Sequence, residues 1–248
     1  MRLDLYLSIN GLSKSRTEAQ TLIKKGYVKV DNRKVTTPSF QVDDDMDVLR
    51  CQVDRSEIKY VSRGGLKLEA ALDYFSVDVT GHVCLDVGAS SGGFTDCLLQ
   101  RGAAHVYAVD AGKDQIAPAI RASDKVTVIE NYNARYMVAD DFSQRPTLAT
   151  MDVSFISQTL ILPLLYNVLS DDAEVITLVK PQFELTKSAL TKKGIVKNDA
   201  LRQDALTRVE MSAKSIGFQV IGKMTSPLLG GDGNIEFLMH LKKEGDKK

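Results

Sequence analysis

The first residues that could do chemistry lie in a glycine-rich turn. An apolar run over residues 83–87 leads into the turn, and a helical pattern follows it. The residues of interest are Asp86, Gly88, Ser90, Gly92 and Gly93. Glycine lets a nucleoside lie against bare backbone, because no Cβ stands in the way. We therefore predict that this turn binds a nucleoside.

A second carboxylate, Asp110, follows the next apolar run and stands 24 residues after Asp86. A carboxylate at this place can accept hydrogen bonds from both ribose hydroxyls. A dinucleotide would require the pattern G-x-G-x-x-G, but Ser90 occupies the second glycine position, and Asp86 would face a pyrophosphate with a negative charge. S-adenosylmethionine has no phosphate and carries two cationic groups, so we predict it as the cofactor.

Four more ionisable residues stand beside predicted elements. Asp152 stands at the end of the fourth apolar run, and Lys180 follows the fifth. Glu236 lies at the rim of the last predicted hairpin, and Lys67 lies just inside a helix before the first strand. Ligands of an open sheet bind beyond the carboxyl ends of its strands. A single lysine there is also typical of an ordinary surface charge, so the significance of these residues depends on their combination.

The apolar runs predict a mostly parallel sheet with helices on both faces. Strands are expected at 83–87, 106–109, 126–129, 148–153 and 175–179. A helix over 201–215 follows, and two strands at 219–224 and 235–241 form a hairpin around a glycine-rich turn at 230–234. The predicted fold is an α/β, Rossmann-like domain with an antiparallel C-terminal hairpin.

The N-terminal segment is basic, with eight Lys and Arg residues against three acids in its first 36 residues. A short helix from Leu3, a capping box from Ser15 to Glu18, a stop at Gly26 and a hairpin turning at Asp31 are predicted. This pattern resembles an S4 RNA-binding domain, although it would also fit a basic scaffolding module. The expected RNA contacts are Arg2, Arg16, Lys24, Lys25, Lys29, Arg33 and Lys34.

The predicted division is a small α+β S4-like domain with its linker at 1–60 and a methyltransferase domain at 61–248. Lys67, Asp152, Lys180 and Glu236 resemble the Lys-Asp-Lys-Glu tetrad of the FtsJ-like 2′-O-ribose methyltransferases. The whole chain is similar to the TlyA (hemolysin A) family. That resemblance implies methyl transfer from S-adenosylmethionine to cytidine 2′ hydroxyls of ribosomal RNA, with ribosomal subunits as partners and no metal. The short chain resembles the form linked to 23S RNA, and 16S RNA is the second candidate.

The tetrad suits this acceptor, because a ribose hydroxyl is a weak acid and a poor nucleophile. A lysine hydrogen-bonded to that oxygen would stabilise the developing alkoxide, and we expect Lys180 to do so. Asp152 and Glu236 would position the lysines and balance their charge. Lys67 would hold either the substrate ribose or Lys180.

Two assignments stay open at this point. Asn133 is expected near the adenine ring, whereas Arg135 fits a cofactor contact and a structural ion pair equally well. Four lysines between Lys187 and Lys197 fit either a basic lid over RNA or an ordinary solvated loop.

Composition favours a cytoplasmic protein without a membrane span. The three cysteines are odd in number and widely spaced, which indicates reduced thiols, and the most apolar stretch, 155–169, is too short to cross a bilayer. A hydrolase with a G-x-S-x-G elbow at Gly88 is a rival, but its only late histidine is His240, inside a strand pattern. A non-catalytic RNA-binding or ribosome-assembly protein is a second rival, and a hemolysin-type activity is a third.

Overall fold

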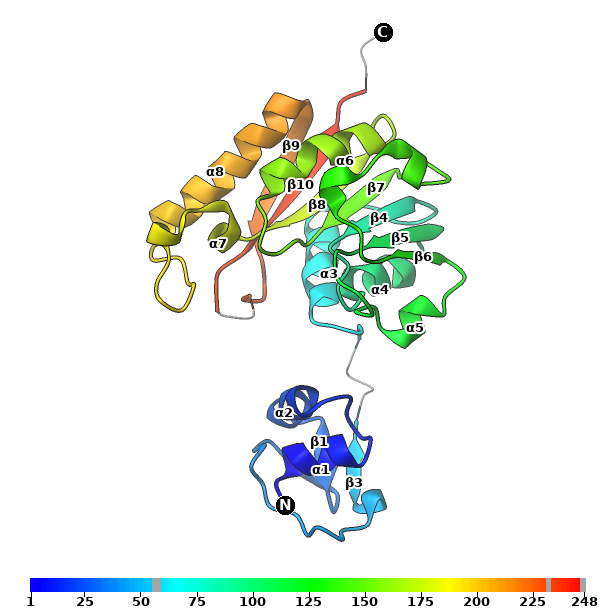
Figure 1. Ribbon diagram of the computed structural model, residues 1–248, viewed down its shortest axis with the longest axis vertical. Coiled ribbons are helices and arrows are strands. Elements are labelled where there is room, and N and C mark those ends of the chain that lie inside the picture. Colours follow the sequence, from blue (N-terminus) through cyan, green and yellow to red (C-terminus); the bar gives the residue numbers. More distant parts are fainter. Residues whose placement is uncertain (55–58, 231–232, 246–248) are drawn as a thin grey trace. The chain divides into compact units, whose positions relative to one another are not determined.

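The computed structural model describes residues 1–54, 59–230 and 233–245. The chain divides into two units, Met1–Lys59 and Tyr60–Lys248, each with its own core (Figure 1). The stretch 54–62 is polar and charged, which favours it as the linker within the predicted boundary region, and it includes residues 55–58; the predicted turn at 230–234 includes residues 231–232. These six residues lie outside the described part of the chain.

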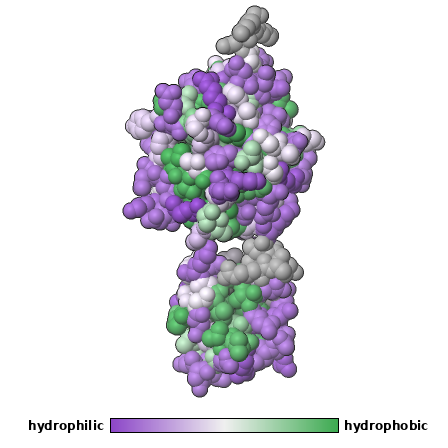
Figure 2. Space-filling model, turned by 90° about the vertical axis from the view of Figure 1, so that its right-hand side faces the viewer, coloured by the Kyte–Doolittle hydropathy of each residue, from purple (hydrophilic) through white to green (hydrophobic). Residues whose placement is uncertain are grey.

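The first unit packs two helices against a small antiparallel sheet. Its elements are α1 (Leu3–Ile9), α2 (Arg16–Lys24), β1 (Val28–Val30), β2 (Arg33–Val35), a 3₁₀ turn (Val48–Arg50) and β3 (Cys51–Val53). The strand order is β2-β1-β3, so β1 is central. Apolar side chains also reach the surface of this unit (Figure 2), among them Ile9, Phe40 and Leu49.

Two details of this unit differ from the sequence predictions. Strand β3 was not predicted, because its three residues follow an acidic stretch that is typical of a turn. The capping box forms only in part: Ser15 Oγ accepts from the N–H of Glu18 at 3.1 Å, but the Glu18 carboxylate accepts from Lys14 instead of Ser15. Both interactions still satisfy backbone donors at the start of α2.

The second unit contains a seven-stranded sheet in the order β6-β5-β4-β7-β8-β10-β9. Its strands are β4 (Val83–Val87), β5 (His105–Val109), β6 (Val126–Ile129), β7 (Leu148–Met151), β8 (Glu174–Val179), β9 (Phe218–Thr225) and β10 (Phe237–Lys243). Its helices are α3 (Gly64–Phe75), α4 (Gly93–Gln100), α5 (Pro118–Arg121), α6 (Leu162–Val168), α7 (Pro181–Glu184) and α8 (Asp199–Ile216). Strands β4 to β8 are parallel, and β10 and β9 are antiparallel.

Helices cover both faces of this sheet (Figure 1). On one face α3 and α4 pack on alternate strand residues such as Cys84, Leu178 and Leu238. On the other face α6 and α8 pack on the intervening residues, for example Leu85 and Val179. This alternation follows from the two-residue period of a strand. The predicted fold, a mostly parallel α/β sheet with an antiparallel C-terminal hairpin, is confirmed.

The strand register brings distant residues together at the carboxyl edge. Val87 pairs with Met151, so the next residues, Gly88 and Asp152, are neighbours. Strand β7 was predicted to continue to residue 153, but it ends at Met151. The N–H of Asp152 still donates to the carbonyl of Val87 at 2.9 Å, so Asp152 stands at the very end of the strand. Among the described residues, no helix is long and apolar enough to cross a membrane.

Candidate active site

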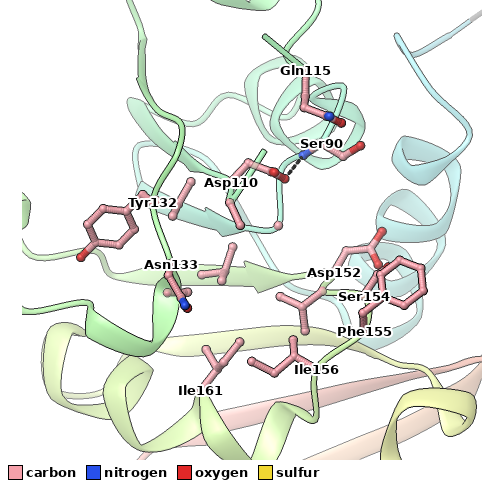
Figure 3. Close-up of a pocket in the computed structure, with 16 residues that line it drawn as sticks. Ser90, Asp110, Gln115, Tyr132, Asn133, Asp152, Ser154, Phe155, Ile156 and Ile161 are labelled. Atoms are coloured by element: carbon pink, nitrogen blue, oxygen red, sulfur yellow. Dashed lines mark hydrogen bonds between the residues drawn. The ribbon is translucent and has the colours of Figure 1, made fainter. Parts of the chain in front are cut away.

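A cavity of about 570 Å³ opens where β4, β5 and β7 end (Figure 3). Gly88 and Ser90 from the glycine-rich turn, Asp110 from the end of β5, and Asn133 line it. Asp152 also lines it, from the end of β7. The structure thus brings five of the residues singled out in the sequence to one site.

The carboxylate of Asp110 is held in a fixed orientation at this cavity. Its Oδ2 accepts from the N–H of Ser90 at 2.7 Å (Figure 3). Its Oδ1 accepts from the N–H of Gly112 at 2.6 Å. Each carboxylate oxygen has a further lone pair that can accept a ligand hydroxyl. The group is therefore prepared to receive a ribose.

Gly88 cannot be replaced without disturbing the site. Its φ is +84°, and a Cβ there would lie 2.6 Å from the carbonyl oxygen of Asp152. Gly92, with φ of +90°, precedes the first residue of α4. The bare backbone, the fixed carboxylate and the cavity volume fit the nucleoside part of S-adenosylmethionine.

Asp86 does not line this cavity, although it was predicted as a cofactor contact. Its side chain is fully buried and accepts hydrogen bonds from Thr95 Oγ1 at 2.7 Å and Thr150 Oγ1 at 3.0 Å. Burial raises the pKa of Asp86 to about 7. In the structure Asp86 joins β4 to α4 and β7, and the sequence could not reveal its two threonine partners.

Asn133 uses its side chain in part for local structure. Its Oδ1 accepts from the N–H of Arg135 at 3.0 Å, so its amide NH₂ is the group left to face the cavity. Arg135 itself is exposed and does not line the cavity.

A second cavity of about 280 Å³ adjoins the first. It is lined by Lys67 of α3 and Gly93 of α4, and it shares Gly88, Ser90 and Asp152 with the larger cavity. A donor in the first cavity and an acceptor in the second would therefore meet beside Asp152.

The four predicted tetrad residues form two ion pairs. Lys180 Nζ lies 2.6 Å from Asp152 Oδ1, and Lys67 Nζ donates to Glu236 Oε2 at 2.5 Å. The lysine side chains are only 13% and 12% exposed, respectively. Low exposure weakens solvent screening, so each pair is a strong local constraint.

The sheet explains why these pairs lie near one another. Phe237 pairs with Val179, so Glu236 stands across from Lys180 at the strand ends. Leu178 and Leu238 face α3 and α4. Lys180 lies two residues after Leu178, and Glu236 lies two residues before Leu238, so both lie on the same side of the sheet. Lys67 approaches from α3, which covers that face.

Three residues beside Lys180 were not singled out in the sequence. Lys180 Nζ donates to Ser154 Oγ at 2.8 Å and lies 5.9 Å from the ring centroid of Phe183. Phe155 is 91% exposed and lies 4.9 Å from Phe183 between ring centroids. The sequence offered one signal for this aromatic pair, a large aromatic residue close after an Asp at a strand end. It could not predict that Phe155 has a left-handed φ of +62°.

A buried polar network supports the segment that carries these residues. The Glu184 carboxylate accepts from Ser157 Oγ at 2.5 Å and from the N–H of Gln158 at 2.8 Å. Gln158 in turn accepts from Thr177 Oγ1 of β8 at 2.8 Å. Burial raises the pKa of Glu184. The network ties the loop after β7 to α7, the helix that follows Lys180.

Comparison with known proteins adds independent evidence. Residues 60–243 match the model of the FtsJ-like methyltransferases, and residues 1–49 match that of the S4 domain. The chain is 43% identical to YqxC of Bacillus subtilis (strain 168), with 99% of this chain and 86% of that protein covered. It is 40% identical to the 16S/23S rRNA (cytidine-2′-O)-methyltransferase TlyA of Mycobacterium tuberculosis (strain H37Rv), covering 99% and 91%.

The protein is an FtsJ-like methyltransferase of the TlyA (hemolysin A) family. A solved structure from Streptococcus thermophilus is similar to this family member, with a TM-score of 0.78 and 41% identity over 98% of this chain and 88% of that one. Membership in the FtsJ-like family confirms the predicted enzyme class and the predicted methyl donor, S-adenosylmethionine.

The S4 domain of this TlyA family member holds two of its predicted RNA contacts on one carboxylate. Asp4 is fully buried and accepts from Arg2 Nε at 3.0 Å, Arg16 Nε at 3.1 Å and Gln20 Nε2 at 2.8 Å. The hydrogen bond from Arg2 is the main reason that the pKa of Asp4 lies well below its usual range. The other predicted contacts, Lys24, Lys25, Lys29, Arg33 and Lys34, are exposed or half-buried.

Proposed function

We propose that this protein transfers the methyl group of S-adenosylmethionine to the 2′ hydroxyl of a cytidine in ribosomal RNA, in the cytoplasm. The observation that carries the proposal is the junction of the two cavities at Asp152, beside the Lys180 ammonium group. The name of the Mycobacterium tuberculosis relative supports cytidine as the acceptor. We propose 23S RNA as the first substrate and 16S RNA as the second.

In this proposal Lys180 stabilises the alkoxide that develops as the ribose hydroxyl loses its proton. Asp152 Oδ1 lies 2.6 Å from the ammonium group and Ser154 Oγ accepts from it at 2.8 Å, so two neighbouring groups fix its position before the reaction. Fixed charges in a site shielded from water stabilise developing charge most effectively. When bound, S-adenosylmethionine supplies an electrophilic methyl group on its sulfonium.

Lys67 and Glu236 act as the second pair in the acceptor cavity. Glu236 is 2% exposed and keeps Lys67 oriented toward that cavity, where the ammonium group can donate to a ribose or phosphate oxygen. Orientation of two bound reactants recovers a large part of the entropic barrier. Asp110 and Asn133 hold the donor nucleoside from the other cavity.

The rings of Phe155, which is exposed, and Phe183, which is half-buried, give the acceptor side an aromatic surface. Unstacked bases of RNA can stack on such rings, and this stacking depends little on which base is bound. The basic face of the S4 domain, carrying Arg2 and Arg16, supplies sequence-independent contacts to phosphates.

The test uses the full chain, tritiated S-adenosylmethionine and separated ribosomal subunits from a strain that lacks this enzyme. We expect label in cytidine, within a dinucleotide that resists alkaline hydrolysis, because a 2′-O-methyl group blocks attack on the adjacent phosphate. Label in a base, or label lost to alkali as a mononucleotide, would contradict the proposal.

The main rival is a non-catalytic RNA-binding protein. It would bind the same subunits through the S4 domain and leave them unlabelled at every enzyme concentration. A filter-binding measurement on the same samples separates this outcome from failure to bind.

A further inference from the structure

A lysine hairpin at residues 187–197 projects from the methyltransferase unit. It carries Lys187, Lys192, Lys193 and Lys197, and its sequence contains no Asp, Glu or aromatic residue. All four lysines are exposed, and none forms an ion pair with any carboxylate in the described part of the chain. Four unneutralised charges on eleven residues make a strongly positive surface.

The segment is folded as a hairpin. Leu190 bridges to Val196, and the N–H of Thr191 donates to the carbonyl of Ile195 at 2.8 Å. Gly194, with φ of +76°, closes the turn. Lys192 and Lys193 therefore stand together at its tip.

A buried amide clasps this hairpin to the second unit. Asn234 is 2% exposed, its Oδ1 accepts from the N–H of Val196 at 3.0 Å, and its Nδ2 donates to the carbonyl of Gly194 at 3.0 Å. Both polar ends of the side chain are thus used on the hairpin. A buried amide with both ends satisfied fixes the position of the segment that it binds.

The clasp lies close to the tetrad along the chain. Asn234 is two residues before Glu236, so their Cα atoms are at most about 7 Å apart. In Figure 1 the hairpin, in yellow, lies near α7 and beside the connection between β9 and β10. The hairpin is therefore anchored beside the segment that carries Glu236.

We propose that the lysine hairpin binds backbone phosphates of the RNA a few nucleotides from the methylated ribose, and that Asn234 positions it for this contact. The inference rests on the proposed RNA substrate. Lysine is a compact point charge suited to phosphate, and the hairpin has neither an aromatic ring to stack on a base nor an arginine to bind one through two hydrogen bonds. It adds affinity near the site without adding sequence preference.

The first test compares two double variants of the full chain. Lys192→Ala/Lys193→Ala removes the tip charges. The control, Lys125→Ala/Lys242→Ala, removes two lysines at the amino ends of the parallel strands, one just before β6 and one near the end of the antiparallel strand β10. The readout is methylation of large ribosomal subunits between 50 and 200 mM KCl.

The tip variant should raise KM for the subunits on the order of tenfold and lower the slope of log(kcat/KM) against log salt by about 1 to 2. The KM for S-adenosylmethionine should not change, because neither lysine lines the cofactor cavity. Equal KM values and equal slopes for the two double variants would overturn the proposal. Absence of methylation by the wild type would instead refute the proposed function.

The second test addresses the clasp. Asn234→Ala keeps every lysine but frees the hairpin, so it should raise KM for the subunits while KM for S-adenosylmethionine is retained. In the Asn234→Ala background, removal of the tip lysines should cost clearly less than it costs in the wild type. Strictly additive losses would show that Asn234 does not position the hairpin.

Discussion

Two regions of this molecule use a carboxylate to hold a cation, and they use it for different ends. In the first unit Asp4 holds Arg2 and Arg16, whose side chains remain 41% and 50% exposed. In the second unit Asp152 and Glu236 hold lysines that are only 12–13% exposed. The first arrangement leaves the cation open to solvent, and the second keeps it in a site sheltered from water.

In the proposed mechanism, burial of the cation, more than the identity of its partner, separates a docking contact from a catalytic one. A half-exposed guanidinium is screened by solvent and contributes modestly and additively to RNA binding. A shielded ammonium group acts strongly on charge that develops beside it. The same shielding makes the second arrangement more sensitive to loss of one partner.

The largest effect is expected from breaking a shielded pair. Glu236→Gln leaves the shielded Lys67 without its counter-ion, which should lower the free energy of unfolding by about 3–5 kcal/mol. Chemical denaturation measures this loss. Lys67→Met/Glu236→Leu should recover most of the stability but no methyl transfer, and recovery of activity would contradict a catalytic use of the pair.

Asp86 extends the comparison to a buried carboxylate that has hydroxyl partners instead of a cation. Its pKa rises from 3.8 to about 7, so the folded state binds the proton more tightly than the unfolded chain. The resulting stability is present below about pH 4 and is lost as pH rises through 7, at about 1.4 kcal/mol per pKa unit. Denaturation of Asp86→Asn across pH 4–8 should lack this slope, and a slope equal to that of the wild type would contradict the account.

Removal of the shared carboxylate in the first unit should have a smaller effect. Asp4→Asn weakens the hold on Arg2 and Arg16, and we expect KM for ribosomal subunits to rise on the order of tenfold with kcat unchanged. Steady-state kinetics at fixed salt measures both constants. A fall in kcat without a change in KM would place Asp4 outside RNA docking.

The smallest effect is expected for one exposed cation. Arg16→Ala should raise KM for the subunits a few-fold and lower the salt slope by about 1, as expected for one phosphate contact. Arg145→Ala, on the second unit, serves as the control for an exposed arginine. Identical salt slopes for the two variants would remove Arg16 from the docking surface.

The sequence predicted most of the sheet, because short apolar runs that end at a glycine or a charged residue are typical of buried parallel strands. Residues 83–87 and 126–129 are strands with the predicted bounds. Strand β3 was missed, since its pairing with β1 depends on a contact with residues more than twenty positions away. The site residues could be named, but their pairing as Lys67 with Glu236 and Lys180 with Asp152 depends on strand register and on the position of α3.

Other features depend on contacts between distant parts of the chain. The hydrogen bonds of Asp86 to Thr95 and Thr150 join three elements that no local pattern connects. The clasp between Asn234 and the hairpin likewise joins segments 38 and 40 residues apart.

The central claim is that the shielded Lys180 ammonium group stabilises the reacting ribose oxygen. Single-turnover methylation of ribosomal subunits by Lys180→Ala, with both substrates saturating, tests it most directly. We predict a rate at least about 100-fold below that of the wild type, with unchanged affinity for S-adenosylmethionine by calorimetry. A rate within about threefold of the wild type, less than 1 kcal/mol in the barrier, would contradict the claim.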